Sequence, residues 1–161
     1  RTRPDRGEFV PVTLLHHAGI CVSDMAESLR FYVDGIGLAV LVDTVLPADL
    51  HPLLGVHTTS VRTVFLGDPA NSYAGIVELL DLGVPDRVDA PAQSGLPARG
   101  VFLLSVQVDV TATLQRLAGL GLGGTPRTMP TPDGGLAATV VDPDGVMVEL
   151  LNRGRLSLME Q

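Results

Sequence analysis

The sequence predicts an α+β fold built from two βαβββ modules, and three observations support this prediction. The order strand, helix, strand, strand, strand occurs twice along the 161 residues. Residues 75–83 (GIVELLDLG) and 145–154 (GVMVELLNRG) share the core VELL, and similar glycine motifs, GIGL at 35–38 and GLGL at 119–122, close the two predicted helices. These repeats indicate an internal duplication whose period is too long for a solenoid.

The first module begins with a β-rich run over residues 13–22, followed by a predicted helix over 24–34. Asp24 and Glu27 have the spacing of a capping box, and Met25, Leu29 and Tyr32 fall on one helical stripe. Strands are predicted at 38–45, 60–67 and 75–82, each bounded by turn residues. The segment 46–59 (LPADLHPLLGVHTT) lies between the first two of these strands.

The second module repeats this order after a connector rich in Pro and Gly. A strand over 101–108 precedes a helix over 110–120, and strands follow at 127–130, 136–143 and 146–153. We therefore divide the chain into a tail at 1–11, a first module at 12–83, a linker at 84–99, a second module at 100–154 and a tail at 155–161.

Composition narrows the classes of function. The net charge is −7, so we do not expect a surface that binds the phosphates of a nucleic acid. The chain has no lysine, so Schiff-base chemistry is not expected either. The single cysteine, Cys21, excludes disulfides within the chain, and no apolar run is long enough to span a membrane. We expect a cytoplasmic, globular protein that binds small molecules, with neither nucleic acid nor membrane as a partner.

Strand parity separates the two neighbouring histidines. Because successive side chains of a strand point to opposite faces, Ile20 and Val22 pack beneath the first helix together with His16. His17 then shares the opposite face with Gly19, where a cavity would lie. The alternative is that the two histidines only mark the end of a strand, with one of them in the core and its ring nitrogens hydrogen-bonded.

Two glutamates occupy strand positions that would normally be apolar. Glu78 shares its face with Ile76 and Leu80, and Glu149 occupies the equivalent place in the second module. A buried carboxylate needs a compensating partner. Pairing with Arg62 or Arg153 is one interpretation. The other is a cavity in which His17 and both glutamates hold a divalent cation such as Zn, Mn, Ni, Co or Fe.

Three stretches resemble the vicinal oxygen chelate superfamily: HHAGICVSDMAESLRFYVDGIGL at 16–38, GIVELLDL at 75–82 and DPDGVMVELLN at 142–152. This family includes glyoxalase I, epimerases, extradiol dioxygenases and bleomycin-resistance binding proteins. The resemblance implies a glyoxalase-like fold in which the two modules form a cupped, barrel-like mixed sheet. It also implies that His17, Glu78 and Glu149 are the first, second and fourth metal ligands, whereas Leu103 stands where the family has its third, a histidine.

The resemblance implies an enzyme of the glyoxalase type. A divalent metal would assist an isomerase, epimerase or lyase reaction on a carbonyl or vicinal-oxygen substrate through an enediolate-like intermediate, with Glu149 and Glu78 as catalytic carboxylates. The alternative is a metal-free protein that binds an antibiotic, as bleomycin-resistance proteins do, and a ring-cleaving dioxygenase is the third choice. We expect the substrate pocket to include Leu103, Ser105, Gln107, Arg62 and His57.

The segment 46–59 has no counterpart in the second module. We expect it to form a lid or wall of the cavity, with His51 and His57 on its surface, either of which could supply the missing third ligand. We also expect a homodimer, and the sequence leaves open whether the modules pair within one chain or between two.

Overall fold

The computed structural model describes residues 14–84, 100–132 and 134–152, so both predicted tails and nearly all of the predicted linker lie outside the described residues. The first module contains β1 (His17–Cys21), α1 (Met25–Leu29), the π-helix η1 (Arg30–Ile36), β2 (Ala39–Leu46), α2 (His51–Leu54), β3 (Val61–Gly67) and β4 (Ile76–Asp81). The second contains β5 (Leu103–Val108), α3 (Val110–Leu120), β6 (Gly123–Pro130), β7 (Leu136–Val141) and β8 (Met147–Asn152).

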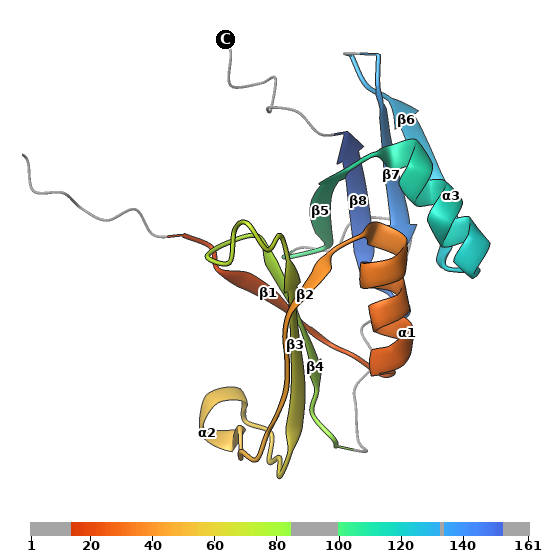
Figure 1. Cartoon of the computed structure of the whole chain (residues 1–161). Helices are drawn as coiled ribbons and strands as arrows, with labels where there is room; N and C mark the ends of the chain where they lie inside the picture. The colour runs from red at the N-terminus through yellow and green to blue at the C-terminus, as the bar shows by residue number, and fades with distance from the viewer. Residues whose placement is uncertain (1–13, 85–99, 133, 153–161) are drawn as a thin grey trace, which may run out of the picture.

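Each module folds into its own four-stranded sheet, and the two sheets have the same topology (Figure 1). The strand order is β1-β4-β3-β2 in the first sheet and β5-β8-β7-β6 in the second. The first strand of each module runs parallel to the last, and the other neighbours are antiparallel. The predicted duplication and the two βαβββ modules are therefore confirmed, and among the described residues α2 is the one helix that the sequence did not predict.

The first helix begins where the sequence indicates. The Asp24 carboxylate accepts hydrogen bonds from the amides of Ala26 and Glu27, which caps α1. The helix continues as η1 and stops at Gly37, whose φ of 96° belongs to the left-handed region that glycine adopts readily. Because α1 and η1 together cover residues 25–36, the predicted helix over 24–34 is confirmed.

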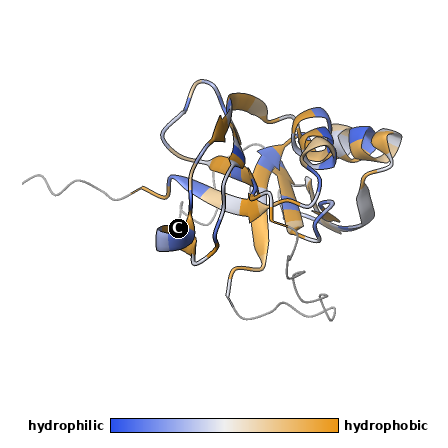
Figure 2. Ribbon diagram, turned by 90° about the horizontal axis from the view of Figure 1, so that it is seen from below, coloured by the Kyte–Doolittle hydropathy of each residue, from blue (hydrophilic) through white to orange (hydrophobic). Residues whose placement is uncertain are grey.

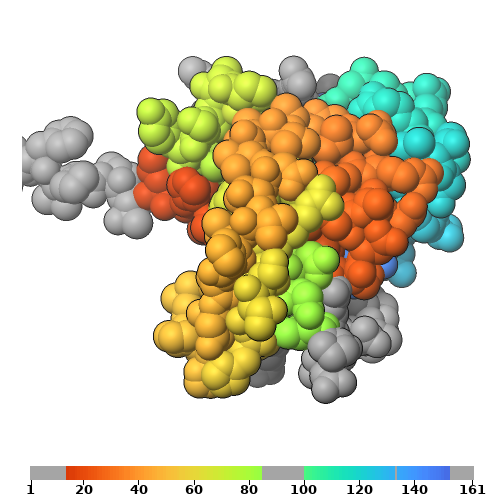
Figure 3. All heavy atoms as spheres, turned by 60° about the horizontal axis from the view of Figure 1, so that its bottom comes forward, coloured from red at the N-terminus to blue at the C-terminus, as the bar shows by residue number. Residues whose placement is uncertain are grey.

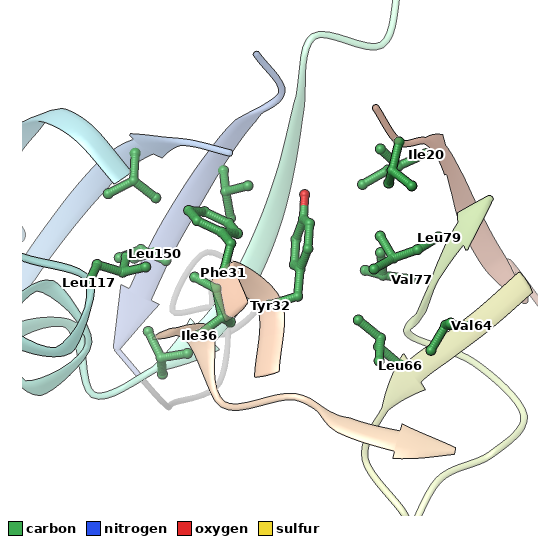
Figure 4. Packing of buried hydrophobic residues seen from close by; sticks show 14 of the residues in the cluster. Ile20, Phe31, Tyr32, Ile36, Val64, Leu66, Val77, Leu79, Leu117 and Leu150 are labelled. Carbon is green, nitrogen blue, oxygen red and sulfur yellow. The ribbon is translucent and has the colours of Figure 1, made fainter. Parts of the chain in front are cut away.

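One hydrophobic core is shared by both modules. Phe31 and Tyr32 of η1 are fully buried and stand between Leu79 of the first sheet and Leu150 of the second (Figure 4). In Figure 2 the helical ribbons are coloured partly orange and partly blue, so apolar and polar residues are mixed along them. Since η1 packs against α3, the helices join the two modules.

Carboxylates of the second module reach across to the first. The Tyr32 hydroxyl donates a 2.8 Å hydrogen bond to Asp142, which is 4% exposed. Asp144 accepts from the Ser23 amide at 2.8 Å and from the Ser28 hydroxyl at 3.3 Å. The turn that precedes β8 therefore helps to hold the start of α1, some 120 residues away in sequence.

The segment that carries α2 protrudes from one end of the molecule (Figure 3). The Asp49 carboxylate accepts hydrogen bonds from the His51 and Thr58 amides and contacts the His57 ring at 3.0 Å. These bonds lower the pKa of Asp49, the His51 amide most of all. No helix among residues 14–84, 100–132 and 134–152 is long and apolar enough to cross a membrane.

Candidate active site

His17 and Glu78 form a close pair on the face of the first sheet that turns away from the shared core. Strand β1 runs beside β4 with Gly19 opposite Glu78, so the side chains of His17 and Glu78 lie on one face. His17 Nε2 is 3.1 Å from Glu78 Oε2, and the glutamate side chain is only 15% exposed. An imidazole and a half-buried carboxylate therefore meet at the position that strand parity indicates.

Two neighbours from β3 orient this pair. The Thr63 hydroxyl donates a 2.8 Å hydrogen bond to Glu78 Oε1. Phe65 lies opposite Glu78 in the sheet, and its ring meets the His17 ring edge-on, with centroids 5.7 Å apart. Neither residue was predicted from the sequence, although strand parity could have found them, because Val64 and Leu66 pack into the core and leave Thr63 and Phe65 on the other face.

His16 is exposed, so the expectation that it packs beneath the first helix is wrong. Strand β1 begins only at His17, and the alternation of strand faces therefore does not extend to His16. Instead, His16 Nδ1 lies 2.8 Å from His17 Nδ1, where one ring donates and the other accepts.

Glu149 occupies the equivalent place in the second sheet. It pairs with Ser105 of β5 on one side and with Thr139 of β7 on the other. The Ser105 hydroxyl donates a 2.8 Å hydrogen bond to Glu149 Oε2. Leu103 and Gln107 share the face of Ser105, so three of the expected pocket residues lie beside this glutamate.

The two glutamates occupy different sheets of the chain. We call the sheet faces that turn away from the shared core the outer faces. The outer face of the first sheet carries His17, Thr63, Phe65 and Glu78. The outer face of the second sheet carries Ser105, Arg127, Thr139 and Glu149. Within the described part of the chain, no three His, Cys, Asp or Glu side chains lie close enough to hold a metal ion. The structure thus joins His17 to Glu78 and leaves Glu149 apart from them.

Arg62 lies away from the glutamates. It shares the strand face of Val64, which packs into the core, and its Nε and Nη2 donate to the Asp43 carboxylate at 3.1 and 2.8 Å. This bidentate bond lowers the pKa of Asp43. Among the described residues, the partners of Glu78 are therefore His17 and Thr63, not the expected Arg62. The other expected partner, Arg153, lies outside the described residues.

The two histidines of the protruding segment contact each other. His51 and His57 stack with ring centroids 3.9 Å apart and an interplanar angle of 5°. His57 Nδ1 is 3.0 Å from Asp49, and its side chain is 77% exposed. Neither ring contributes to a three-residue donor group in the described structure, so their role as a wall or as a replacement ligand stays a prediction.

The donor atoms of His17 and Glu78 fit two positions of a first-row metal site. Imidazole nitrogen and carboxylate oxygen are ligands that Zn, Mn, Fe, Co and Ni accept, and here they already point at each other. Leu103 offers no donor atom, so a site with three protein ligands would need its third from another surface. Glu149, with Ser105 bonded to only one of its oxygens, has the right chemistry.

The family of the chain follows from its sequence. Residues 14–150 match the glyoxalase/bleomycin resistance protein/dioxygenase superfamily. This match covers most of the chain, which therefore belongs to that superfamily.

Several known proteins are similar to this chain in sequence or in structure. The chain is 38% identical over 153 residues to the lactoylglutathione lyase-like protein terB of Aspergillus terreus, covering 89% of this chain and 77% of that protein. The glyoxalase I structure of Leishmania major is similar with a TM-score of 0.58 and 24% identity over 92% and 91% of the two chains. TnmS3, an antibiotic binding protein from Streptomyces sp. CB03234, is similar with a TM-score of 0.56 and 22% identity over 90% and 99%.

Proposed function

We propose that the protein is a metal-assisted lyase or isomerase. It moves a proton between two neighbouring carbons of a 2-oxo adduct, the carbonyl carbon and the carbon next to it. The observation that carries the proposal is the His17–Glu78 pair, whose donor atoms lie 3.1 Å apart on an outer face in a member of the glyoxalase superfamily. The 38% identity to a lactoylglutathione lyase-like protein supports a thiol adduct as substrate, with the hemithioacetal of methylglyoxal and glutathione as the first compound to test.

The site requires a second copy of the chain. Glu149 cannot reach His17 and Glu78 within one described chain, because both outer faces turn away from the core that the modules share. The outer faces also expose apolar side chains, including Val42 at 48% and Met129 at 62%. In a two-fold dimer, the first outer face of one copy would meet the second outer face of its partner, which would cover these side chains and form two equal sites.

The residues of the chain have separate tasks in this site. His17 Nε2 and Glu78 Oε2 would hold the metal, which when bound would polarise the substrate carbonyl. Thr63 fixes the Glu78 carboxylate through Oε1, and Phe65 keeps the His17 ring in place. Both contacts reduce the freedom of the donors before anything binds.

Glu149 would carry the proton. Its Oε2 accepts from Ser105, and its Oε1 has no hydrogen-bond partner among the described residues, so Oε1 can accept a proton from the carbon next to the carbonyl. Returning that proton to the neighbouring carbon, while the hydroxyl proton moves to the oxygen of the former carbonyl, converts a hemithioacetal into a thioester of a 2-hydroxy acid. Atoms and electrons balance without any oxidant, because the reaction is an isomerisation.

Mixing two inactive variants tests the shared site. His17→Ala and Glu149→Gln should each abolish turnover of the glutathione–methylglyoxal adduct. After joint unfolding and refolding at equal amounts, random pairing makes half of the dimers mixed, and each mixed dimer has one intact site, so about a quarter of wild-type activity should return. No recovery, in a mixture shown by native mass spectrometry to contain mixed dimers, would contradict a site shared between copies.

Metal uptake tests the other half of the proposal. Calorimetric titration with Zn²⁺, Ni²⁺ or Mn²⁺ should show binding by the wild type and weaker binding by Glu149→Gln. The heat for the wild type should vary with the ionisation enthalpy of the buffer, because metal binding releases protons. Equal metal responses in the two proteins would remove Glu149 from the site.

Antibiotic binding without a metal is the second candidate. It is favoured by Leu103 at the position where the family has a histidine and by the fold shared with TnmS3. Under this alternative, the outer faces hold the ligand by apolar contact, and Glu149→Gln leaves ligand affinity unchanged. Absence of both metal uptake and turnover, together with tight binding of an aromatic antibiotic, would favour it.

A further inference from the structure

Arg127 lies in the same row of residues as Glu149. Across the second sheet, Arg127 of β6 is paired with Thr139, Thr139 with Glu149, and Glu149 with Ser105. Directly paired residues of neighbouring strands project to the same side. The guanidinium therefore belongs to the outer face on which Glu149 would act.

The positive charge of Arg127 has no partner within the described structure, unlike those of the other three arginines there. Arg30 pairs with Glu27, Arg62 with Asp43, and Arg116 donates to the carbonyl oxygens of Gly35 and Ile36. Arg127 is exposed and makes no hydrogen bond or ion pair to a described residue. Its five donors are thus available for a ligand.

The corresponding row of the first sheet has no charge at this place. There Val42, Phe65, Glu78 and Gly19 lie in line across the four strands. The two rows have a glutamate in common, but only the second adds a cation. This asymmetry would make the two sides of the proposed site unlike, because only the row of the second sheet attracts an anion.

An irregular stretch of β6 comes just before Arg127. The pairing of β6 with β7 shifts register between Gly123 and Arg127, and Gly123 and Gly124 have φ angles of 89° and 63°. Irregularities of this kind re-aim side chains and often lie beside active sites. Because β6 is the edge strand of its sheet, Arg127 is also open to a ligand from the side.

Strand spacing sets the size of the ligand. Neighbouring strands lie about 4.8 Å apart, so the two inter-strand spacings from β6 to β8 place the backbones of Arg127 and Glu149 roughly 10 Å apart. A guanidinium binds a carboxylate through two parallel hydrogen bonds. The net charge of −7 gives the protein no general attraction for anions, so a single local cation would orient the ligand as well as bind it.

We propose that Arg127 holds a carboxylate of the substrate whose reacting carbon lies at Glu149. This assignment rests on the proposed function and makes the substrate an anionic carbonyl adduct, with the carboxylate several bonds from the carbon that exchanges its proton. Arg127 is a specificity residue in this scheme, since it contacts the substrate far from the reacting atoms.

Paired substrates test the assignment. The methylglyoxal adducts of glutathione and of glutathione diethyl ester differ in their carboxylates. Arg127→Gln should raise KM for the glutathione adduct by about 10- to 100-fold with little change in kcat, as expected for loss of a charge-assisted bond, and should leave the ester adduct unaffected. Arg127→Lys should recover part of the loss, and Arg30→Gln, which removes the same charge from η1, should have no effect.

The outcomes separate this assignment from the proposed function. An unchanged KM in Arg127→Gln, or equal losses with both adducts, would overturn the role of Arg127. If the wild type converts neither adduct, the proposed function fails, and calorimetric binding of S-methylglutathione and its diethyl ester then decides. Weaker binding of the free acid alone by Arg127→Gln would support the assignment. Equal binding by both proteins, or no binding at all, would overturn it.

Discussion

Replacement of Tyr32 by phenylalanine should destabilise the protein in a way that depends on pH. The tyrosine is fully buried, and its hydroxyl donates at 2.8 Å to a buried carboxylate. Burial raises the pKa of Tyr32, and the neighbouring Asp142 charge raises it further, so the hydroxyl keeps its proton and can donate it at neutral pH. Tyr32→Phe removes that donor and leaves Asp142 Oδ2 without it in an apolar setting.

The size of the loss follows from the type of bond. Hydrogen bonds to charged groups contribute about 1.5–3 kcal/mol, so we expect the free energy of unfolding to fall by about 2 kcal/mol at pH 7. With a urea m-value of roughly 2 kcal/mol per molar, the midpoint should fall by about 1 M. Tyr73→Phe is the matched control: because the Tyr73 side chain is 77% exposed, removal of its hydroxyl should leave the free energy of unfolding nearly unchanged.

The pKa of Asp142 fixes the sign of the pH dependence. Burial raises this pKa above its ordinary value of 3.8, against the lowering effect of the Val146 and Asp144 amides and the Tyr32 hydroxyl. The folded state therefore binds the proton more tightly, so the contribution of Asp142 to stability is greatest in acid and falls as pH rises through the window above 3.8.

Removing the Tyr32 donor raises the pKa of Asp142 further, and the penalty of Tyr32→Phe should therefore shrink as the pH is lowered toward 4. Urea unfolding followed by circular dichroism at pH 4.5 and pH 7 measures both values. A penalty that is absent at pH 7, or one that grows in acid, would refute the reasoning.

Three further predictions concern stability. Gly35→Ala should lower the free energy of unfolding by about 1–3 kcal/mol, because the added Cβ would lie 2.4 Å from Leu117 Cδ2. Its control, Gly119→Ala, has nothing within 4 Å of the added Cβ and should be neutral or stabilising by up to about 1 kcal/mol. Thermal unfolding that ranks the two variants the other way would contradict this. Asp144→Ala removes two bonds to the first module and should cost about 1–2 kcal/mol, measured by urea unfolding, with Asp68→Ala as a comparison in the turn that stays within its own module. Asp43→Asn breaks an exposed ion pair and should change the melting temperature by a few degrees at most, so a large fall would show that Arg62 has a further structural role.

Local patterns predicted the elements well because each element depends on nearby residues. The capping carboxylate of Asp24, the stripe of Met25 and Tyr32, and the glycine ends of the helices all appear in the structure as the sequence indicates. Parity placed His17 and Ser105 on the faces of the two glutamates, since strand alternation is a geometric property of the backbone. It failed at His16, which precedes the first paired residue.

The relation between the two modules could not be predicted in the same way. A shared core depends on contacts such as Tyr32 with Asp142, which are separated by 110 residues and leave no periodic signal in either segment. The same reason hides the separation of Glu149 from His17 within one chain. Arg62 and Arg127 illustrate the intermediate case: their strands were predicted, but the face of each residue became clear only from the register with β2 and β7.

The long-range bonds of Asp142 and Asp144 have a consequence for the order in which the protein folds during synthesis. The first helix leaves the ribosome well before the residues that hold Ser23, Ser28 and Tyr32 have been made. Contacts this distant in sequence slow folding and leave early segments exposed while they wait. We expect the first module made alone to remain incompletely packed, with a donor at Tyr32 that has no acceptor. The first helix would then gain these bonds only after the turn that precedes β8 has left the ribosome, so the synthesis of this turn sets the time at which the first helix packs fully.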